Sequence, residues 1–355
     1  MKIVFIASAA SIHSIKWINF FVNGKNEIYL ITTTKPNHET KIEIEKIRTK
    51  INLLVLNNLK NFFKIPIFLI KGNYSLVHIH YLGWHSLLSL FINSNSKLIV
   101  TPWGSDILTK RTFLKNIWLR ILFKKSNFMI CDSERLVNES IKLGLKKSKS
   151  MVTMFGVDTN LYKKSRDIFA NNNCYYVGSN RKLEDVYDVK TFIKAAKLIC
   201  QNRDDIFFYI VGNGSLEKKY RKEIEAVNLK DKIKFLGLLN KSQMIDFYNN
   251  IDIYVSTSLS DGGLAASIAE AMSFERLIIA SNNSDNKIWI KNKQNGYLFE
   301  SGDYKKLSNK IIYAIENKKN SIIISKSSRN LIVENYSYEK EMKRVNEKYI
   351  EILSK

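Results

Sequence analysis

Short apolar runs recur along the whole chain and alternate with longer segments that have helical spacing. In the first half, the runs typical of strands are 2–8, 27–33, 51–57, 75–81, 97–103 and 127–133. In the second half they are 173–179, 206–212, 232–237, 251–257, 276–281 and 296–299. Strands separated by helix-length segments predict a parallel sheet with helices on both faces. The pattern therefore predicts an α/β chain with two Rossmann-like, doubly wound units in tandem.

The predicted boundary between these units lies between Val157 and Asn173, where periodicity is lost and Asn and charged residues gather. We place an N-terminal domain at residues 1–165 and a C-terminal domain at residues 170–335. The last segment, 336–355, is predicted to be a helix that packs back toward the N-terminal domain. Its apolar face would carry Met342, Val345, Tyr349 and Ile352. A length of 355 residues also suits two domains better than one core.

The first residues, MKIVFIASAAS, resemble a signal peptide, but the apolar part, Ile3 to Ala7, is short and fits a buried strand better. No apolar run is long enough to cross a bilayer. The cysteines Cys131, Cys174 and Cys200 are odd in number and far apart, so they form no disulfide framework and no metal-ligand spacing. We therefore expect a protein of the reducing cytoplasm.

The net charge of +23 could indicate a nucleic-acid-binding protein. However, only 11 of the 56 basic residues are arginine, which is the residue preferred for base-edge and bidentate phosphate contacts. The lysines are also spread over the whole length. We expect attraction to an anionic membrane face or to a diphosphate ligand, and no nucleic-acid partner.

In doubly wound units, ligands bind beyond the carboxyl ends of the strands. In YYVGSNRK, Gly178 would let the chain turn sharply, and Arg181 and Lys182 would follow the strand end. Two cations there could hold a diphosphate, although a solvated loop is the alternative. The nearby Gly212-x-Gly214 lacks the third glycine of a dinucleotide-binding motif and favours a plain tight turn.

The segment STSLSDGGLAASIAEAMS, residues 256–273, follows a predicted strand. Its two glycines, Gly262 and Gly263, allow the backbone to approach a ligand closely. A helix starting near Leu264 would direct its first N–H groups at an anion. Glu270 would lie about two turns into that helix, where an ordinary surface glutamate is the alternative interpretation.

This segment, together with the later NGYLFESGDYKKLSNKI, resembles the donor-binding signature of retaining GT-B glycosyltransferases of family 4, the glycosyl transferases group 1 type. VGNGSLEKKY, IKFLGLLNKSQMIDFYNNIDIYVSTS, VHIHYLGWHSLLS and TPWGSDIL occur in the order expected for this family. The resemblance covers nearly the whole chain, more specifically in the second half. It implies the GT-B fold, in which two Rossmann-like domains face each other across a cleft.

The resemblance implies roles for individual residues. Glu270 would accept hydrogen bonds from the ribose hydroxyls of a nucleotide-sugar. Asp261, in a place usually held by glutamate, would grip hydroxyls of the donor sugar, and Arg181 would neutralise the diphosphate leaving group. These two are the predicted catalytic residues. The other predicted donor-binding positions are Gly178, Lys182, Gly262, Gly263 and Leu264.

The sequence departs from the family pattern in three ways. Asp261 and Glu270 are nine positions apart, whereas the two acidic residues of the family are normally eight apart. The lysine that many members have a few residues after the arginine would fall near Tyr187 and Asp188, where this sequence has no lysine. Trp103 replaces a histidine near the donor sugar, which makes Trp103, Asp106 and His13 the candidates for the acceptor or sugar pocket.

We therefore predict a retaining hexosyltransferase that uses a nucleotide-sugar, with UDP- and GDP-sugars favoured, and needs no metal or cofactor. The acceptor would be a glycan or lipid-linked precursor of bacterial surface polysaccharide. The segment 110–128 resembles a basic amphipathic helix, so the enzyme could be peripheral on the inner face of the membrane; a core-facing helix is the alternative. The alternative functions are a non-enzymatic nucleic-acid-binding protein and a sugar-nucleotide epimerase or dinucleotide enzyme on a similar fold.

Overall fold

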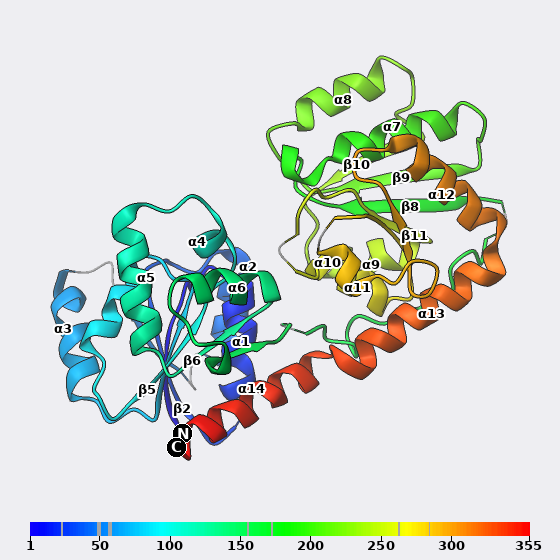
Figure 1. Ribbon diagram of the computed structural model, residues 1–355. Helices are drawn as coiled ribbons and strands as arrows, with labels where there is room; N and C mark the ends of the chain where they lie inside the picture. The colour runs from blue at the N-terminus through cyan, green and yellow to red at the C-terminus, as the bar shows by residue number, and fades with distance from the viewer. Residues whose placement is uncertain are drawn as a thin grey trace. The chain divides into compact units, whose positions relative to one another are not determined.

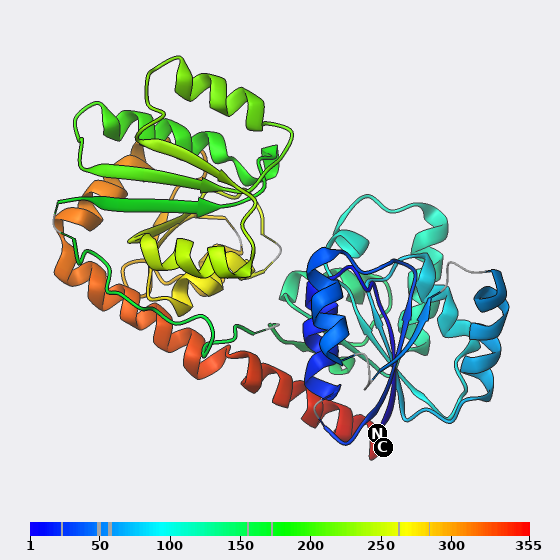
Figure 2. The same cartoon turned by 180° about the vertical axis from the view of Figure 1, so that it is seen from behind.

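The computed structural model describes residues 1–22, 24–47, 51–55, 59–154, 156–171, 173–261, 263–283 and 285–355. The chain divides into two compact units. Unit 1 comprises Met1–Phe155 and Glu339–Lys355, and unit 2 comprises Gly156–Tyr338. Each unit consists of a parallel sheet with helices packed on both faces (Figures 1 and 2).

The sheet of unit 1 has, among the described residues, seven parallel strands in the order β3-β2-β1-β4-β5-β6-β7. These strands are β1 Lys2–Ile6, β2 Glu27–Thr32, β3 Ile51–Val55, β4 Leu76–His80, β5 Lys97–Thr101, β6 Phe128–Cys131 and β7 Ser150–Val152. Its main helices are α1 Ile12–Val22, α2 His38–Ile47, α3 Leu59–Lys71, the 3-10 helix η2 Trp84–Phe91, α4 Ser105–Leu108, α5 Phe113–Lys125, α6 Glu134–Lys142 and α14 Tyr338–Leu353.

The sheet of unit 2 has six parallel strands over the described part of the chain, in the order β10-β9-β8-β11-β12-β13. They are β8 Tyr175–Asn180, β9 Ile206–Val211, β10 Ile233–Gly237, β11 Ile253–Ser256, β12 Leu277–Ser281 and β13 Tyr297–Phe299. The main helices are α7 Val189–Cys200, α8 Glu217–Glu225, α9 Lys241–Asn250, α10 Ala266–Ser273, α11 Asn286–Trp289, α12 Tyr304–Glu316 and α13 Lys318–Asn335.

The structure confirms each predicted strand and the doubly wound class. The first strand, β1, is buried and pairs in parallel with β2 and β4, as expected of a core strand. The sequence missed β7, because three residues are too few to show a periodicity. In both sheets the strand order reverses beside the first strand of the unit, between β1 and β4 and between β8 and β11. These two switch points are where doubly wound sheets bind ligands.

The C-terminal helix α14 completes unit 1. Its predicted apolar face, Met342, Val345, Tyr349 and Ile352, is buried. The ring of Tyr349 stacks on Phe21 with centroids 4.8 Å apart. Within the described residues, no helix reaches the length and apolar character that crossing a bilayer requires.

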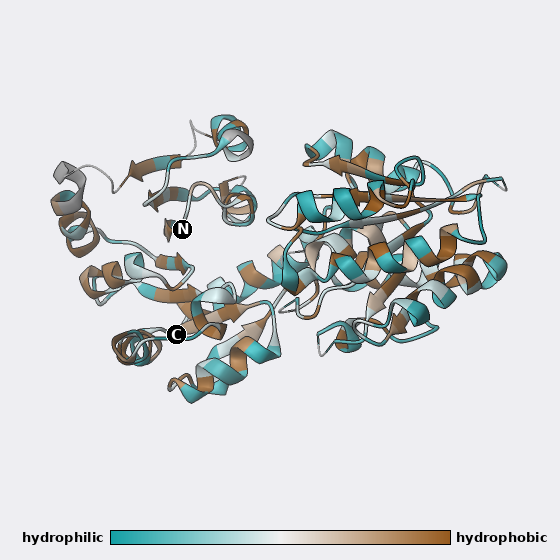
Figure 3. Ribbon diagram, turned by 90° about the horizontal axis from the view of Figure 1, so that it is seen from above, coloured by the Kyte–Doolittle hydropathy of each residue, from teal (hydrophilic) through white to brown (hydrophobic). Residues whose placement is uncertain are grey.

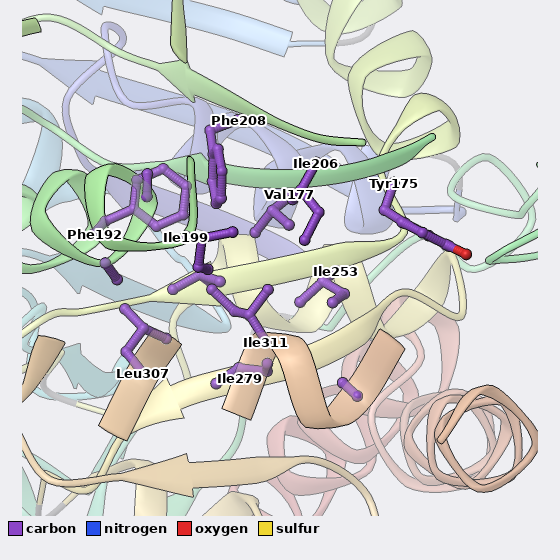
Figure 4. Packing of buried hydrophobic residues seen from close by; sticks show 14 of the residues in the cluster. Tyr175, Val177, Phe192, Ile199, Ile206, Phe208, Ile253, Ile279, Leu307 and Ile311 are labelled. Atoms are coloured by element: carbon purple, nitrogen blue, oxygen red, sulfur yellow. The ribbon is translucent and has the colours of Figure 1, made fainter. Parts of the chain in front are cut away.

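The core of unit 2 is built from alternate residues of the strands. Val177, Phe208, Ile253 and Ile279 point into one apolar cluster together with residues of α7 and α12 (Figure 4). Gly178 faces the other side of the sheet, toward α9. A Cβ atom on Gly178 would come within 2.7 Å of Phe247 Cζ and 2.8 Å of Ile251 Cγ2. The expectation that Gly178 forms a sharp turn is therefore wrong, because its missing side chain is what lets α9 pack against β8.

Replacing Gly178 by alanine should destabilise unit 2 by about 1–3 kcal/mol, the usual cost of overpacking a filled core. The free energy of unfolding, measured in urea, would show this. Adding Phe247→Leu to the variant should recover part of the loss, since it removes the ring atom closest to the new methyl group. If the single variant were as stable as the parent protein, the close packing of α9 on β8 would be contradicted.

Candidate functional site

Arg181 and Asp261 meet at the switch point of unit 2. Arg181 directly follows β8, and Asp261 lies in the segment after β11. The Arg181 Nη2 and Asp261 Oδ1 atoms are 3.1 Å apart, and the side chains are only 9% and 1% exposed. Arg181 Nη2 also donates to the Ser256 hydroxyl at 2.9 Å. The structure thus brings together the two residues predicted to be catalytic, as a buried ion pair at the carboxyl end of the sheet.

Two glycines after β9 allow the backbone to pass close to the segment that contains Arg181. A Cβ atom on Gly212 would lie 2.3 Å from the Arg181 carbonyl oxygen, and one on Gly214 would lie 2.4 Å from the Leu183 carbonyl oxygen. Gly212 also has a φ of +123°, which side chains disfavour. The Arg181 N–H donates to the Val211 carbonyl at 3.1 Å. Gly212-x-Gly214 is therefore more than a tight turn, because it lets the backbone after β9 support the arginine.

Glu270 is the end of a chain of hydrogen-bonded side chains that the sequence did not predict. The Tyr248 hydroxyl, from α9, donates to Glu270 Oε2 at 2.9 Å. Asn180, at the end of β8, donates to the Tyr248 hydroxyl at 3.0 Å and accepts from the Tyr254 hydroxyl at 2.6 Å. Burial and the Glu270 charge raise the pKa of Tyr248 well above its ordinary value, so Tyr248 stays a donor at neutral pH. We call these four residues the Glu270 chain.

The remaining predicted donor-binding residues lie around α10 and the end of β8. Lys182 is exposed. Gly263 is buried with a φ of +144°, and Leu264 packs on an apolar cluster of unit 2. Gly262 lies outside the described residues. Helix α10 begins at Ala266, two residues later than expected, so Leu264 precedes its first turn.

Asp285 is a further site residue that sequence reasoning missed. Its Oδ2 atom accepts from the Asp261 N–H at 3.2 Å, and its side chain lies in the segment between β12 and α11. Asp285 therefore positions the backbone of Asp261, while Arg181 pairs with the Asp261 side chain. A carboxylate that orients another residue from a distant segment leaves no local signal in the sequence.

The candidates in unit 1 lie at its own switch point. His13, near the start of α1, and Trp103, after β5, have ring centroids 5.5 Å apart. The ring of His80, at the end of β4, lies 5.8 Å from that of Trp103. His80 ends β4, and His13 and Trp103 lie in the segments after β1 and β5, so the three rings come from three different strands or strand ends. The structure thus brings two of the predicted pocket residues together, and their role in binding stays a prediction.

Asp106 has a structural task that the sequence did not suggest. It is fully buried, and its carboxylate accepts from the N–H groups of Leu82 at 2.7 Å, Trp103 at 3.0 Å and Gly104 at 2.9 Å. Burial raises the pKa of Asp106. Because its oxygens bind backbone groups of two loops, Asp106 ties the loop after β4 to the loop after β5. The structure therefore does not support a direct contact between Asp106 and the sugar.

The buried histidines of unit 1 predict a dependence of stability on pH. Burial lowers the pKa of His80 to about 3 and that of His78 well below its ordinary value. Both stay neutral in the folded state but take up protons near pH 6.5 when unfolded. Unfolding therefore becomes easier as the pH falls below about 6.5, by up to about 1.4 kcal/mol per histidine for each pH unit.

Urea unfolding at about pH 7.5 and about pH 5.5 would measure this loss. Tryptophan fluorescence suits the purpose, because four of the five tryptophans lie in unit 1. His80→Asn should make the stability less dependent on pH, whatever its effect at neutral pH. An unchanged pH dependence in that variant would contradict the prediction.

The described residues contain no group of three or more His, Cys, Asp or Glu side chains that could hold a metal ion. The site of unit 2 instead gathers cationic, carboxylate and hydroxyl groups at a switch point. Two doubly wound parallel sheets in one chain, with this site on the second, are the arrangement expected of the GT-B class.

Comparison with known proteins agrees with this class. Residues 2–133 match the family described as glycosyl transferase 4-like, and residues 163–332 match glycosyl transferases group 1. The chain therefore belongs to the GT-B glycosyltransferases of the group 1 type. It is thus a glycosyltransferase.

Three similar proteins illustrate the relationship. The UDP-Gal:alpha-D-GlcNAc-diphosphoundecaprenol alpha-1,3-galactosyltransferase of Escherichia coli is 26% identical over 85% of this chain and 82% of that protein. The poly(ribitol-phosphate) alpha-N-acetylglucosaminyltransferase of Staphylococcus aureus is 27% identical over 61% of this chain and 45% of its own length. The crystal structure of Anabaena HepE in complex with UDP and glucose has a TM-score of 0.79 at 18% identity, covering 98% of this chain and 99% of HepE.

Proposed function

We propose that the protein transfers a sugar from a nucleotide-sugar, a UDP- or GDP-sugar, to a glycan or lipid-linked acceptor with retention of the anomeric configuration. The observation that carries the proposal is the Arg181–Asp261 ion pair at the switch point of unit 2, with Glu270 linked to the end of β8 through Tyr248 and Asn180. A diphosphate bound there would meet the guanidinium group, and sugar and ribose hydroxyls would meet the carboxylates.

The Arg181–Asp261 ion pair suggests how the site responds to its donor. Arg181 can pair with only a few oxygens at once, and a diphosphate offers more negative charge than Asp261 does. We infer that donor binding draws Arg181 toward the phosphate and frees Asp261 to accept from the sugar hydroxyls. As the glycosidic bond breaks, negative charge grows on the leaving diphosphate, and Arg181 stabilises it. The acceptor proton would pass to that diphosphate, so no protein base is assigned.

The donor and acceptor classes draw support from the similar proteins. HepE was crystallised with UDP and glucose, and the E. coli relative is named for UDP-Gal and for a diphosphoundecaprenol-linked acceptor. We therefore propose a role in the synthesis of bacterial surface polysaccharide or another glycoconjugate. The membership in a glycosyltransferase family disfavours the nucleic-acid-binding and epimerase alternatives.

A thermal-shift panel with UDP-, GDP-, ADP- and CMP-sugars tests the donor class. We expect a UDP- or GDP-sugar to raise the melting temperature and the other nucleotides to have little effect. NMR of the product formed from that donor would show whether the anomeric configuration is retained. Stabilisation by no nucleotide-sugar would overturn the proposal, and an inverted product would overturn its stereochemistry.

We also propose that catalysis needs no metal, because Arg181 and Lys182 can supply the positive charge at the diphosphate. Turnover should therefore persist in EDTA. Loss of turnover in EDTA, with recovery on addition of a divalent cation, would contradict this.

A further inference from the structure

Three neighbouring elements of unit 1 cover the same face of its sheet. Their inner residues, such as Leu69 of α3, Leu88 of η2 and Leu122 of α5, belong to one buried cluster. Trp118 Nε1 of α5 donates to the Ser86 hydroxyl of η2 at 2.8 Å, and the Asn93 side chain, just after η2, donates to the Ile70 carbonyl of α3 at 3.1 Å. The three elements α3, η2 and α5 therefore form one continuous layer.

The outward side of this layer is apolar as well. Large hydrophobic side chains at least half exposed lie on every one of its elements. Along the helices of unit 1, hydrophobic and hydrophilic residues alternate (Figure 3). The most prominent are Phe63, Ile67, Trp84, Leu90, Phe113 and Leu114. Phe113 and Leu114 are 77% and 75% exposed. Apolar groups gathered in this way on a protein surface indicate an interaction site. We call this surface the outer apolar layer.

Only part of the basic amphipathic helix predicted at 110–128 is open to a partner. On α5, Leu122 is buried and the Trp118 side chain is bonded to η2. Trp118 therefore anchors the helix to unit 1. The most exposed apolar side chains of α5, Phe113 and Leu114, are at its N-terminal end, and Ile117 and Ile121 are less exposed farther along the helix.

The charge around the outer apolar layer is almost entirely positive. From Lys46 to Cys131 the sequence holds a single acidic residue, Asp106, and that residue is buried. Lys64, Arg120 and Lys124 are exposed on α3 and α5. At the N-terminal end of α5, a cavity of about 350 Å³ is lined by residues that include Lys110, Arg111, Arg135 and Glu139. Apolar side chains framed by cations match the acyl chains and headgroups of an anionic bilayer.

We propose that the outer apolar layer docks on an anionic lipid membrane, with Phe113, Leu114 and Trp84 entering the interface and the surrounding lysines and arginines contacting phosphate groups. A second copy of the chain fits less well, because two such layers would bring like charges together. The proposal rests on the proposed function in one respect, since a lipid-linked acceptor would be met at such a surface. Membrane docking itself requires neither donor nor acceptor.

Co-sedimentation with vesicles tests the proposal. The full chain should bind vesicles of phosphatidylcholine with added phosphatidylglycerol, bind phosphatidylcholine alone much more weakly, and be released by salt. Phe113→Ser with Leu114→Ser should lower the partition coefficient between water and anionic vesicles by about 100-fold, because two large apolar side chains are no longer transferred from water into the membrane. The matched control is Leu238→Ser with Ile323→Ser, which changes side chains of unit 2 that are 71% and 66% exposed.

A charge test separates the two contributions. Lys64→Glu, Arg120→Glu and Lys124→Glu together should abolish the preference for anionic vesicles. The same change at three exposed lysines of α8, Lys218, Lys219 and Lys222, should weaken binding far less. Equal losses in both sets would show that net charge alone attracts the vesicles and would overturn the proposed surface.

Two further results would overturn the proposal. One is a wild-type chain that does not bind anionic vesicles. The other is a Phe113→Ser, Leu114→Ser variant that binds vesicles normally but loses self-association in analytical ultracentrifugation, which would identify a second copy as the occupant. Thermal shifts with nucleotide-sugars should be the same in every one of these variants. Failure of docking is thereby distinguished from failure of the proposed transferase function.

Discussion

Arg181→Met is expected to lower kcat/KM by about 100- to 1,000-fold, the usual loss when one group that stabilises transition-state charge is removed. Methionine keeps much of the length of the side chain but carries no charge for the leaving diphosphate. The variant should also be less stable, because it leaves the Asp261 carboxylate buried without its cation. Breaking a buried pair from one side commonly costs about 3–5 kcal/mol.

The two effects can be separated by adding Asp261→Asn to Arg181→Met. The double variant has no buried charge left over, so most of the stability should return while turnover stays low. Steady-state kinetics and urea unfolding on the three proteins would measure both quantities. Recovery of turnover together with stability would show that Arg181 acts only through folding.

Unit 2 provides a matched control for this experiment. Arg166 Nη1 and Asp252 Oδ1 are also 3.1 Å apart, and the Asp252 side chain is 2% exposed. Asp252 precedes β11, so this pair lies at the opposite end of that strand from Asp261. Arg166→Met with Asp252→Asn should lower stability without changing kcat/KM of the folded protein. A comparable fall in kcat/KM there would mean that any damage to unit 2 impairs turnover.

Glu270→Ala is expected to weaken donor binding by about 10- to 100-fold, which corresponds to about 1.4–2.7 kcal/mol for charge-assisted hydrogen bonds to hydroxyl groups. If Glu270 binds the ribose, its removal should weaken UDP and UDP-sugar equally. Asp261→Asn should instead weaken the UDP-sugar more than UDP, because its proposed partners are on the sugar. Calorimetric titration with both ligands distinguishes these roles.

The Glu270 chain gives a graded version of the same test. Tyr248→Phe removes one hydrogen bond to Glu270 Oε2 but leaves the carboxylate in place. Donor affinity should then fall only a few-fold, because the variant loses one hydrogen bond that orients Glu270 but keeps the carboxylate that binds the donor. If Tyr248→Phe weakened binding as much as Glu270→Ala does, Tyr248 itself would have to contact the donor. Unchanged affinity in Glu270→Ala would remove Glu270 from the site.

The sequence predicted the strands because each buried strand is a short apolar run with a polar end. It also predicted that Arg181 and Asp261 would follow two strands, and the sheet order then placed them together. It could not predict the Glu270 chain, because Asn180, Tyr248 and Tyr254 come from separate elements and pair only in the folded sheet.

The error at Gly178 has the same physical origin. Gly178 was assigned to a turn because local sequence shows a glycine but not the ring of Phe247, which comes 69 positions later and fills the space beside it. The place of Asp106 in a pocket stays a prediction, but its backbone contacts could not be predicted. Its actual partners include the N–H of Leu82, a backbone group that carries no side-chain signature.

The contribution of α14 to unit 1 has a consequence for the order of folding during synthesis. Residues 339–355 complete unit 1, and Tyr349 lies fully buried against Phe21 and within hydrogen-bonding distance of Trp17. A ribosome reaches those residues only after making all of unit 2, Gly156–Tyr338. At common translation speeds this takes roughly 10–40 s. During that time the nascent N-terminal unit lacks the apolar face of α14, and Phe21 and Trp17 of α1 lack their contacts with Tyr349. The unit that begins later is therefore free to complete its fold first.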